Sequence, residues 1–409
     1  MRWTSSISDS VPLLDAAHQV TDQALRQLDG APCHLAIVFI SPSYRTRWSD
    51  ALTLIHARLR PGVLIGCSGS GIMAGDREVD SVPAMALVAA SMPEVRLYPF
   101  AVSPEELDRM TCAEWLQKLG IGPEAKPQFI ALADPYTCDP AKLVADANVA
   151  FPGAPMIGGL VSGGREPGDH LLFHDTDVLH AGAVGVALTG NVVMETVVSQ
   201  GCRPIGRPLI ITRSDEHIIW ELGGRPALEA LRQALMGLSP VDHELAQQSI
   251  FAGVVINEMK ANFGPGDFLI RHLVGIDPPT GAMAISEHVT LGQTLQFHLR
   301  DPQASRDELR RLLMQRAAQW RQAPPSGALL FNCLGRGRAF YGASSQDLRT
   351  IRALAGRLPV GGFCCNGEIG PIGSVNRLHS YTASLAVFRP AHSALEPSTA
   401  APARDHQPA

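Results

Sequence analysis

The chain has 409 residues, of which 45% are hydrophobic, so it is long enough for about two or three domains with sizeable cores. Its formal net charge is −5 at pH 7 and it has no basic block, which argues against nucleic acid and anionic membranes as partners. The longest apolar runs, residues 83–92 and 181–190, are too short to span a bilayer, and the N-terminus MRWTSSISDS lacks the apolar stretch of a signal peptide.

The first part of the chain predicts alternating helices and buried strands. Apolar residues recur at helical spacing over residues 10–29 and end at a glycine, which is typical of a helix stop. Continuous apolar runs predict buried strands at residues 34–41 and 63–71, with a helix at residues 48–60 between them. The second strand runs into a glycine turn, and another buried strand follows at residues 84–92.

Two later parts of the chain repeat this order of strand, helix, strand entering glycines, and closing strand. They run through residues 129–135, 140–150, 155–164 and 181–190, and through residues 328–337, 346–358, 360–370 and 380–388. The step marked by Gly66, Gly158 and Gly361 falls at nearly the same place in each unit. We interpret this as a β-α-β-β unit used three times, which must pack against its neighbours to cover its sheet.

Between the second and third units the pattern changes to polar strands, a hairpin turn at residues 277–281 and an Arg-rich helix at residues 304–322. We therefore expect an α/β fold of mixed β-sheets covered by helices, with the repeated units in two related domains. The expected division is an N-terminal helical segment at 1–29, domains at 30–215 and 216–389, and a disordered tail rich in Pro, Ala and Ser at 390–409.

The stretch VGGFCCNGEIGP, residues 360–371, combines four glycines with two thiols, an amide and a carboxylate. Glycine lets a backbone or a ligand approach where a Cβ would clash, so this stretch favours a functional loop. The alternative is a bulge or tight turn whose Asn366 and Glu368 bond only to local backbone groups.

Standard cofactor and metal signatures are weak here. Gly69 to Ala74 fits GxGxxA, but Gly75 and Pro83 follow and argue against the helix that a dinucleotide site needs. His170 and His174 are four apart in a stretch that does not read as a helix, and no HExxH occurs. We expect neither a cofactor nor a metal.

Polar side chains gather at predicted strand ends and glycine loops. An arginine can bind a carboxylate, a glutamate can bind an ammonium group, and an asparagine can serve either, so the set suits an amphoteric small molecule such as an amino acid. For any one of these residues, a structural hydrogen bond to loop backbone is the simpler explanation. The candidate ligand-binding residues are Arg203, Asn257, Asn332, Cys333, Arg336, Cys365, Asn366 and Glu368.

A second hypothesis is a thiol-dependent enzyme or redox sensor that uses Cys333 or the adjacent Cys364 and Cys365. It requires a thiol whose pKa is lowered by a nearby cation, and Arg336 is a candidate beside Cys333. No catalytic signature accompanies these thiols, and buried cysteines are commonly inert. The eight cysteines show no CxxC pair and no regular spacing, so we expect free thiols in a reducing cytoplasm.

With these residues in view, the chain resembles the FIST family, with both a FIST N and a FIST C domain. The resemblance rests on the motifs GCSGSGIMAGD at 66–76, MIGGLVSGG at 156–164, GCRPIG at 201–206, FNCLGRGRAFYG at 331–342, and FCCNGEIGP with the following HSYT at 363–382. It implies an intracellular sensory module that binds a small ligand and signals through a protein partner. Some relatives act in ubiquitin ligation, which implies a protein-interaction scaffold as a third alternative. On this basis we expect a binding protein rather than an enzyme.

Overall fold

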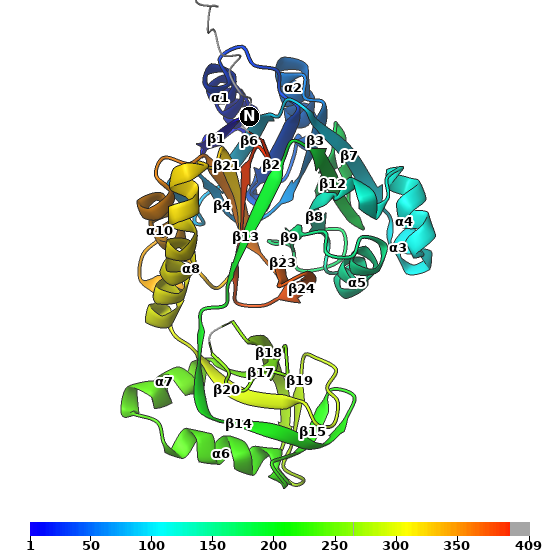
Figure 1. The fold of residues 1–409 in the computed structure, drawn as a ribbon. Coiled ribbons are helices and arrows are strands. Elements are labelled where there is room, and N and C mark those ends of the chain that lie inside the picture. Colours follow the sequence, from blue (N-terminus) through cyan, green and yellow to red (C-terminus); the bar gives the residue numbers. More distant parts are fainter. Residues whose placement is uncertain (265, 393–409) are drawn as a thin grey trace, which may run out of the picture.

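The computed structural model describes residues 1–264 and 266–392, and its strands form four β-sheets (Figure 1). Three of the sheets combine parallel and antiparallel pairs, and helices accompany them, so the predicted α/β class with mixed sheets is confirmed. Most of the tail expected at 390–409 lies outside the described residues, which end at 392. In the described part, no helix has both the length and the apolar character needed to cross a membrane.

Three of the sheets have six strands each and share one strand order. In each, a central parallel pair has a closing strand and an outer strand on one side, and a short hairpin on the other. The first sheet runs β1 (Arg2–Ser8), β6 (Met85–Ser91), β2 (Leu35–Ile40), β3 (Val63–Ser68), β10 (Leu172–His174), β11 (Asp177–Leu179); the second runs β7 (Val95–Val102), β12 (Ala183–Gly190), β8 (Gln128–Ala133), β9 (Met156–Leu160), β23 (Glu368–Ile372), β24 (Val375–His379); the third runs β13 (Val193–Ser199), β25 (Ala383–Arg389), β21 (Gly327–Cys333), β22 (Val360–Cys365), β4 (Ser70–Ala74), β5 (Arg77–Val79). This shared order supports a duplication of the sequence, which stays a prediction.

The hairpins are exchanged around the three sheets. The β4–β5 hairpin follows β3 along the chain but pairs with β22 of the third sheet. The β10–β11 hairpin follows β9 but pairs with β3, and the β23–β24 hairpin follows β22 but pairs with β9. Each unit therefore lends its hairpin to a neighbour and has its own open edge covered by another unit.

A glycine in the second parallel strand of each sheet is required by close packing. At Gly66, Gly158 and Gly362, a Cβ would lie 1.8–2.1 Å from the carbonyl oxygen of the residue opposite on the first strand. No side chain fits at that distance, so the shared glycine has a steric cause. In the third unit this glycine is Gly362, one residue beyond the Gly361 used in the sequence comparison.

The N-terminus contains a strand that the sequence did not predict. Residues 1–29 were expected to be a helical segment, but Arg2–Ser8 form β1, which pairs with β6, and the helix α1 covers only Leu13–Leu28. The buried side chains of β1 include Thr4 and Ser6, whose hydroxyls donate to main-chain carbonyls at 3.1 and 2.9 Å. These small polar residues do not give the apolar alternation by which a strand is recognised.

The three sheets enclose a common apolar core that includes Phe39, Ile130, Phe331 and Phe363. Helices cover the outward faces, as Figure 1 shows, because each presents an apolar stripe to its sheet. The first sheet carries α1 and α2 (Trp48–Leu59); the second carries α3 (Pro104–Arg109), α4 (Cys112–Leu119) and α5 (Pro140–Ala150); the third carries α8 (Pro302–Gln322) and α10 (Gln346–Ala355); α9 (Arg338–Tyr341) and the short 3-10 turns at Pro42–Tyr44 and Pro123–Ala125 lie in loops.

The fourth sheet forms a separate lower body in Figure 1, which the chain enters after β13 and leaves before α8. Its first strand pairs with two others, so six of its seven strands close into a barrel. The expected division at residue 215 falls between β14 and β15, which pair with each other; we therefore retain 30–215 and 216–389 only as a proposed division. The order is β14 (Cys202–Asp215), β20 (Thr294–Arg300), β17 (Ile250–Val255), β18 (Phe268–Asp277), β19 (Ala282–Ile285), β15 (Ile218–Leu222) and β16 (Arg225–Pro226), with helices α6 (Ala227–Met236) and α7 (Pro240–Gln248).

Candidate functional site

Buried polar side chains meet where the barrel joins the third sheet. Asn332 and Cys333 end strand β21, Arg336 lies in the turn that follows, and Glu368 begins β23. Arg300, the last residue of barrel strand β20, approaches the same place. The carboxyl ends of parallel strands are where ligands bind in many α/β proteins, because loops leave the sheet there. We call these five residues the junction cluster.

An ion pair holds one side of the junction cluster in place. Arg336 is only 1% exposed, and its Nε and Nη2 donate to the two carboxylate oxygens of Asp347 at 3.0 and 3.2 Å. The Nδ2 of Asn332 donates to the same carboxylate at 2.9 Å. Burial opposes the charge of Arg336, but the Asp347 carboxylate raises the pKa of this guanidinium above its ordinary value. Arg336 is therefore charged at every physiological pH.

Glycines make room for the two arginines. A Cβ on Gly201, whose φ is +68°, would lie 2.8 Å from Nη1 of Arg336. A Cβ on Gly335 would lie 2.5 Å from Nη1 of Arg300. The glycines of the GCRPIG and FNCLGRG motifs thus let the backbone approach the charged groups, which is the role expected of glycine at a close contact.

Arg300 is held between aromatic rings. Its guanidinium carbon lies 4.1 Å from the ring centre of Phe340 and 4.7 Å from that of Tyr381, and its Nη2 donates to Sγ of Cys333 at 3.4 Å. Cation–π contacts stabilise a partly desolvated guanidinium. Arg300 is therefore a cationic side chain that the barrel contributes to the junction cluster.

Glu368 supplies a carboxyl group beside these cations. Its side chain is fully buried, and Oε2 accepts the main-chain N–H of Thr382 at 3.0 Å. Burial raises the pKa of Glu368 to about 8, although the bonds from Thr382 and the charges of Arg336 and Arg300 oppose the shift. Without a further cation beside it, this carboxyl group is mostly protonated at pH 7.

Three buried polar atoms in the junction cluster make no hydrogen bond within the described part of the chain. They are Nη1 of Arg336, Oδ1 of Asn332 and Oε1 of Glu368. Each unpaired buried atom costs about 1–3 kcal/mol, so such groups call for an explanation. Together they offer a donor for a carboxylate and acceptors for an ammonium group.

The structure brings four of the predicted site residues together and leaves four elsewhere. Asn332, Cys333, Arg336 and Glu368 belong to the junction cluster. The other four have structural contacts: Arg203 pairs with Asp242 and Asp301, Asn257 accepts the N–H of Met259 in an exposed turn, Cys365 is packed in the core against Gly159, and the exposed Asn366 donates to the carbonyl of Val161.

Sequence reasoning did not assign Arg300, Asp347, Tyr381 or Thr382 to a site, although the last two belong to the HSYT motif. Arg300 ends a strand whose sequence alternates polar and apolar residues, and Asp347 lies in the first turn of α10, so neither stood out as a functional residue. Tyr381 has a positive φ of 62°, which is unusual for an aromatic residue, but a sequence does not reveal it.

The thiols of this region are not poised for nucleophilic chemistry. Burial raises the pKa of Cys333 to about 12, with Glu368 adding to the shift and the two arginines opposing it. Burial also raises the pKa of Cys364 and Cys365 well above the ordinary thiol value. A thiolate is the reactive form, so this geometry disfavours the thiol-dependent hypothesis.

Comparisons with known proteins agree in placing the chain. It is 40% identical over 388 residues to an uncharacterized protein of Mycobacterium tuberculosis strain H37Rv, covering 95% of this chain and 100% of the relative. It is 41% identical over 375 residues to an uncharacterized protein of Mycobacterium bovis, covering 91% of this chain and 95% of that relative. A family model for the FIST N domain matches residues 34–225, and one for the FIST C domain matches residues 227–371. These two matches span most of the sequence, so the chain belongs to the FIST family.

Proposed function

We propose that this chain is a sensory module that binds a small amphoteric molecule, such as an amino acid, in the junction cluster and passes the signal to a protein partner. FIST domains are generally sensory domains in signal transduction, which supports the first part of the proposal. The free thiols support a reducing, cytoplasmic setting.

The observation that carries the proposal is the pair of unpartnered atoms on Arg336 and Glu368. A guanidinium N–H can donate to a ligand carboxylate, and a carboxylate oxygen can accept from a ligand ammonium group. An amphoteric ligand supplies both partners at once and relieves two buried, unpaired groups. The Oδ1 of Asn332 offers a further acceptor beside them.

The position of the junction cluster suggests how binding becomes a signal. Arg300 comes from the barrel, whereas Arg336 and Glu368 come from the three-sheet body. A ligand that contacts both sides favours one relative arrangement of the two bodies, and it shifts their equilibrium by its difference in affinity for the arrangements. A protein partner that binds only one of these arrangements would then respond to the ligand.

Isothermal titration of the full chain with the common amino acids, and with matched amines and carboxylic acids, tests the proposal. We expect an amino acid to bind more tightly than either half molecule. Glu368→Gln should weaken the amino acid at least tenfold and leave the carboxylic acid nearly unchanged. Asn366→Ala, which removes an exposed amide outside the cluster, is the matched control. An absence of binding across the panel, or equal affinity in the Glu368→Gln variant, would contradict the proposal.

A further inference from the structure

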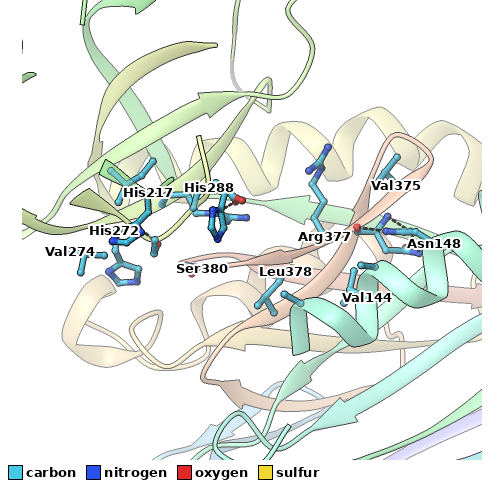
Figure 2. A pocket seen from close by; sticks show the side chains of 17 residues that line it. Val144, Asn148, His217, His272, Val274, His288, Val375, Arg377, Leu378 and Ser380 are labelled. Carbon is cyan, nitrogen blue, oxygen red and sulfur yellow. Dashed lines mark hydrogen bonds and ion pairs between the residues drawn. The ribbon is translucent and has the colours of Figure 1, made fainter. Parts of the chain in front are cut away.

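A second potential binding site lies between the barrel and the second sheet. It is a cleft of about 820 Å³ whose walls are helix α5, the β23–β24 hairpin, and the β18–β19 side of the barrel. Figure 2 shows Arg377 reaching from β24 into this space, with His217, His272 and His288 of the barrel gathered on one side. None of these residues belongs to the junction cluster.

The charges of the cleft are unbalanced. Arg271 is paired, because its Nε donates to Oε2 of Glu287 at 2.6 Å and its Nη1 donates to a main-chain carbonyl at 3.1 Å. Arg377 forms no ion pair within the described residues, and its buried Nε has no hydrogen-bond partner there. The lining thus carries two arginines against one glutamate, in a chain whose net charge is negative.

The positive charge of Arg377 also acts on Arg271. Burial lowers the pKa of Arg271, and the positive charge of Arg377 lowers it further while Glu287 opposes both effects. An anion placed between two cations removes such repulsion and gains charge-assisted hydrogen bonds. Arg377 is free to provide these bonds because Glu287 is already engaged with Arg271.

Apolar side chains form part of the cleft walls. Val144 of α5, Leu378 of β24 and Val274 of β18 line the same cleft as Arg377. Ligand sites commonly combine apolar walls with a few placed polar groups, which set the orientation of the ligand. A small organic acid with an apolar body fits this combination better than a bare inorganic ion.

We propose that this cleft binds a small organic anion, whose carboxylate or phosphate group pairs with Arg377 while its apolar part lies against Val144 and Leu378. The anion also bridges the second sheet and the barrel, since the cleft has walls from both. The proposal does not depend on ligand binding at the junction cluster, because it uses different side chains.

Titration calorimetry of the full chain with benzoate, phenyl phosphate, inorganic phosphate and neutral benzamide tests this inference at constant ionic strength. We expect benzoate or phenyl phosphate to bind, and the stronger of the two identifies the anionic group. Benzamide should not bind, and inorganic phosphate should bind at least tenfold more weakly than phenyl phosphate. Failure of both aromatic anions to bind at millimolar concentration overturns the proposal.

Two variants locate the binding. Arg377→Gln should weaken the aromatic anion at least tenfold, and Arg26→Gln, at an exposed arginine of α1, should not. Val375→Glu places a negative charge at the rim of the cleft on a residue that is 42% exposed, so it tests the charge without disturbing the core. Its matched control is Val149→Glu, at a 67% exposed residue of α5 that does not line the cleft. Equal affinity in wild type, Arg377→Gln and Val375→Glu overturns the inference.

Discussion

The guanidinium of Arg336 faces the carboxylate of Asp347 in a two-point ion pair, with nitrogen–oxygen distances of 3.0 and 3.2 Å, and both side chains are nearly inaccessible to water. This pair fixes the position of the third guanidinium nitrogen of Arg336, the unpartnered Nη1. Asp347 therefore orients the nitrogen that is proposed to bind the ligand, although Asp347 itself does not contact the ligand.

Asp347→Asn should destabilise the protein by about 3–5 kcal/mol, because it leaves the charge of Arg336 buried without its counter-charge. Urea unfolding measures the change. The control is Asp76→Asn, which breaks an exposed pair with Arg352 and should cost less than about 1 kcal/mol. If both variants lose the same stability, the buried pair has no special role.

Glu368→Gln should change how stability depends on pH. The pKa of Glu368 is about 8 in the folded chain, above the ordinary value of 4.5, so the folded state holds this proton more tightly than the unfolded state. Glu368 therefore contributes fully to the free energy of unfolding below its ordinary pKa, and this contribution is lost as pH rises toward 8. The loss is about 1.4 kcal/mol for each pH unit between the two pKa values.

Denaturant unfolding at pH 5 and pH 8.5 measures this effect. The wild type should lose more stability between the two pH values than Glu368→Gln, because the variant lacks the titrating group. Exposed Glu244→Gln on α7 is the matched control and should follow the wild type. A Glu368→Gln curve parallel to the wild-type curve would show that burial does not shift this carboxyl group.

Gly362→Ala should destabilise the third sheet severely, by about 3 kcal/mol or more, because the new Cβ would lie 1.8 Å from the carbonyl oxygen of Leu330. Backbone on both strands would have to move apart, and the parallel pair would weaken. Gly275→Ala is a fair comparison, since no heavy atom lies within 4 Å of the added methyl group. Melting temperatures of the two variants should differ clearly, and similar values would contradict the steric explanation.

Alkylation of the native protein should distinguish buried from exposed thiols. Cys112 is exposed and should react first at neutral pH, whereas Cys333, with a pKa of about 12, should react only after unfolding. Mass spectrometry of the labelled peptides gives the order. Rapid labelling of Cys333 in the folded chain would restore the thiol-dependent hypothesis.

The sequence predicted the buried strands well because their apolar runs, such as the one around Phe39, are bounded by glycine and proline. It missed β1, whose buried Thr4 and Ser6 resemble loop residues in the sequence, although their hydroxyls donate to main-chain carbonyls in the fold. It also could not show which sheet edge each hairpin covers, because an apolar pattern shows that a strand is buried but not which partner it pairs with.

The junction cluster was predicted only in part for a similar reason. Asn332, Arg336 and Glu368 stand out locally because each adjoins a glycine or a strand end. Arg300 belongs to the barrel and becomes a neighbour only when the barrel docks on the third sheet. Local motifs thus identified residues of the three-sheet body and missed the residue that the barrel supplies.

The exchange of hairpins among the three sheets has a consequence for attempts to divide this protein into fragments. Deleting the third unit would remove β23, which pairs with β9. It would also remove β22, which pairs with the β4–β5 hairpin. Either fragment would then expose unpaired strand edges, which pair readily with other chains. A chain cut between its two family segments should therefore aggregate rather than give two functional halves. Co-expressed fragments should become soluble only if they reassemble all three sheets.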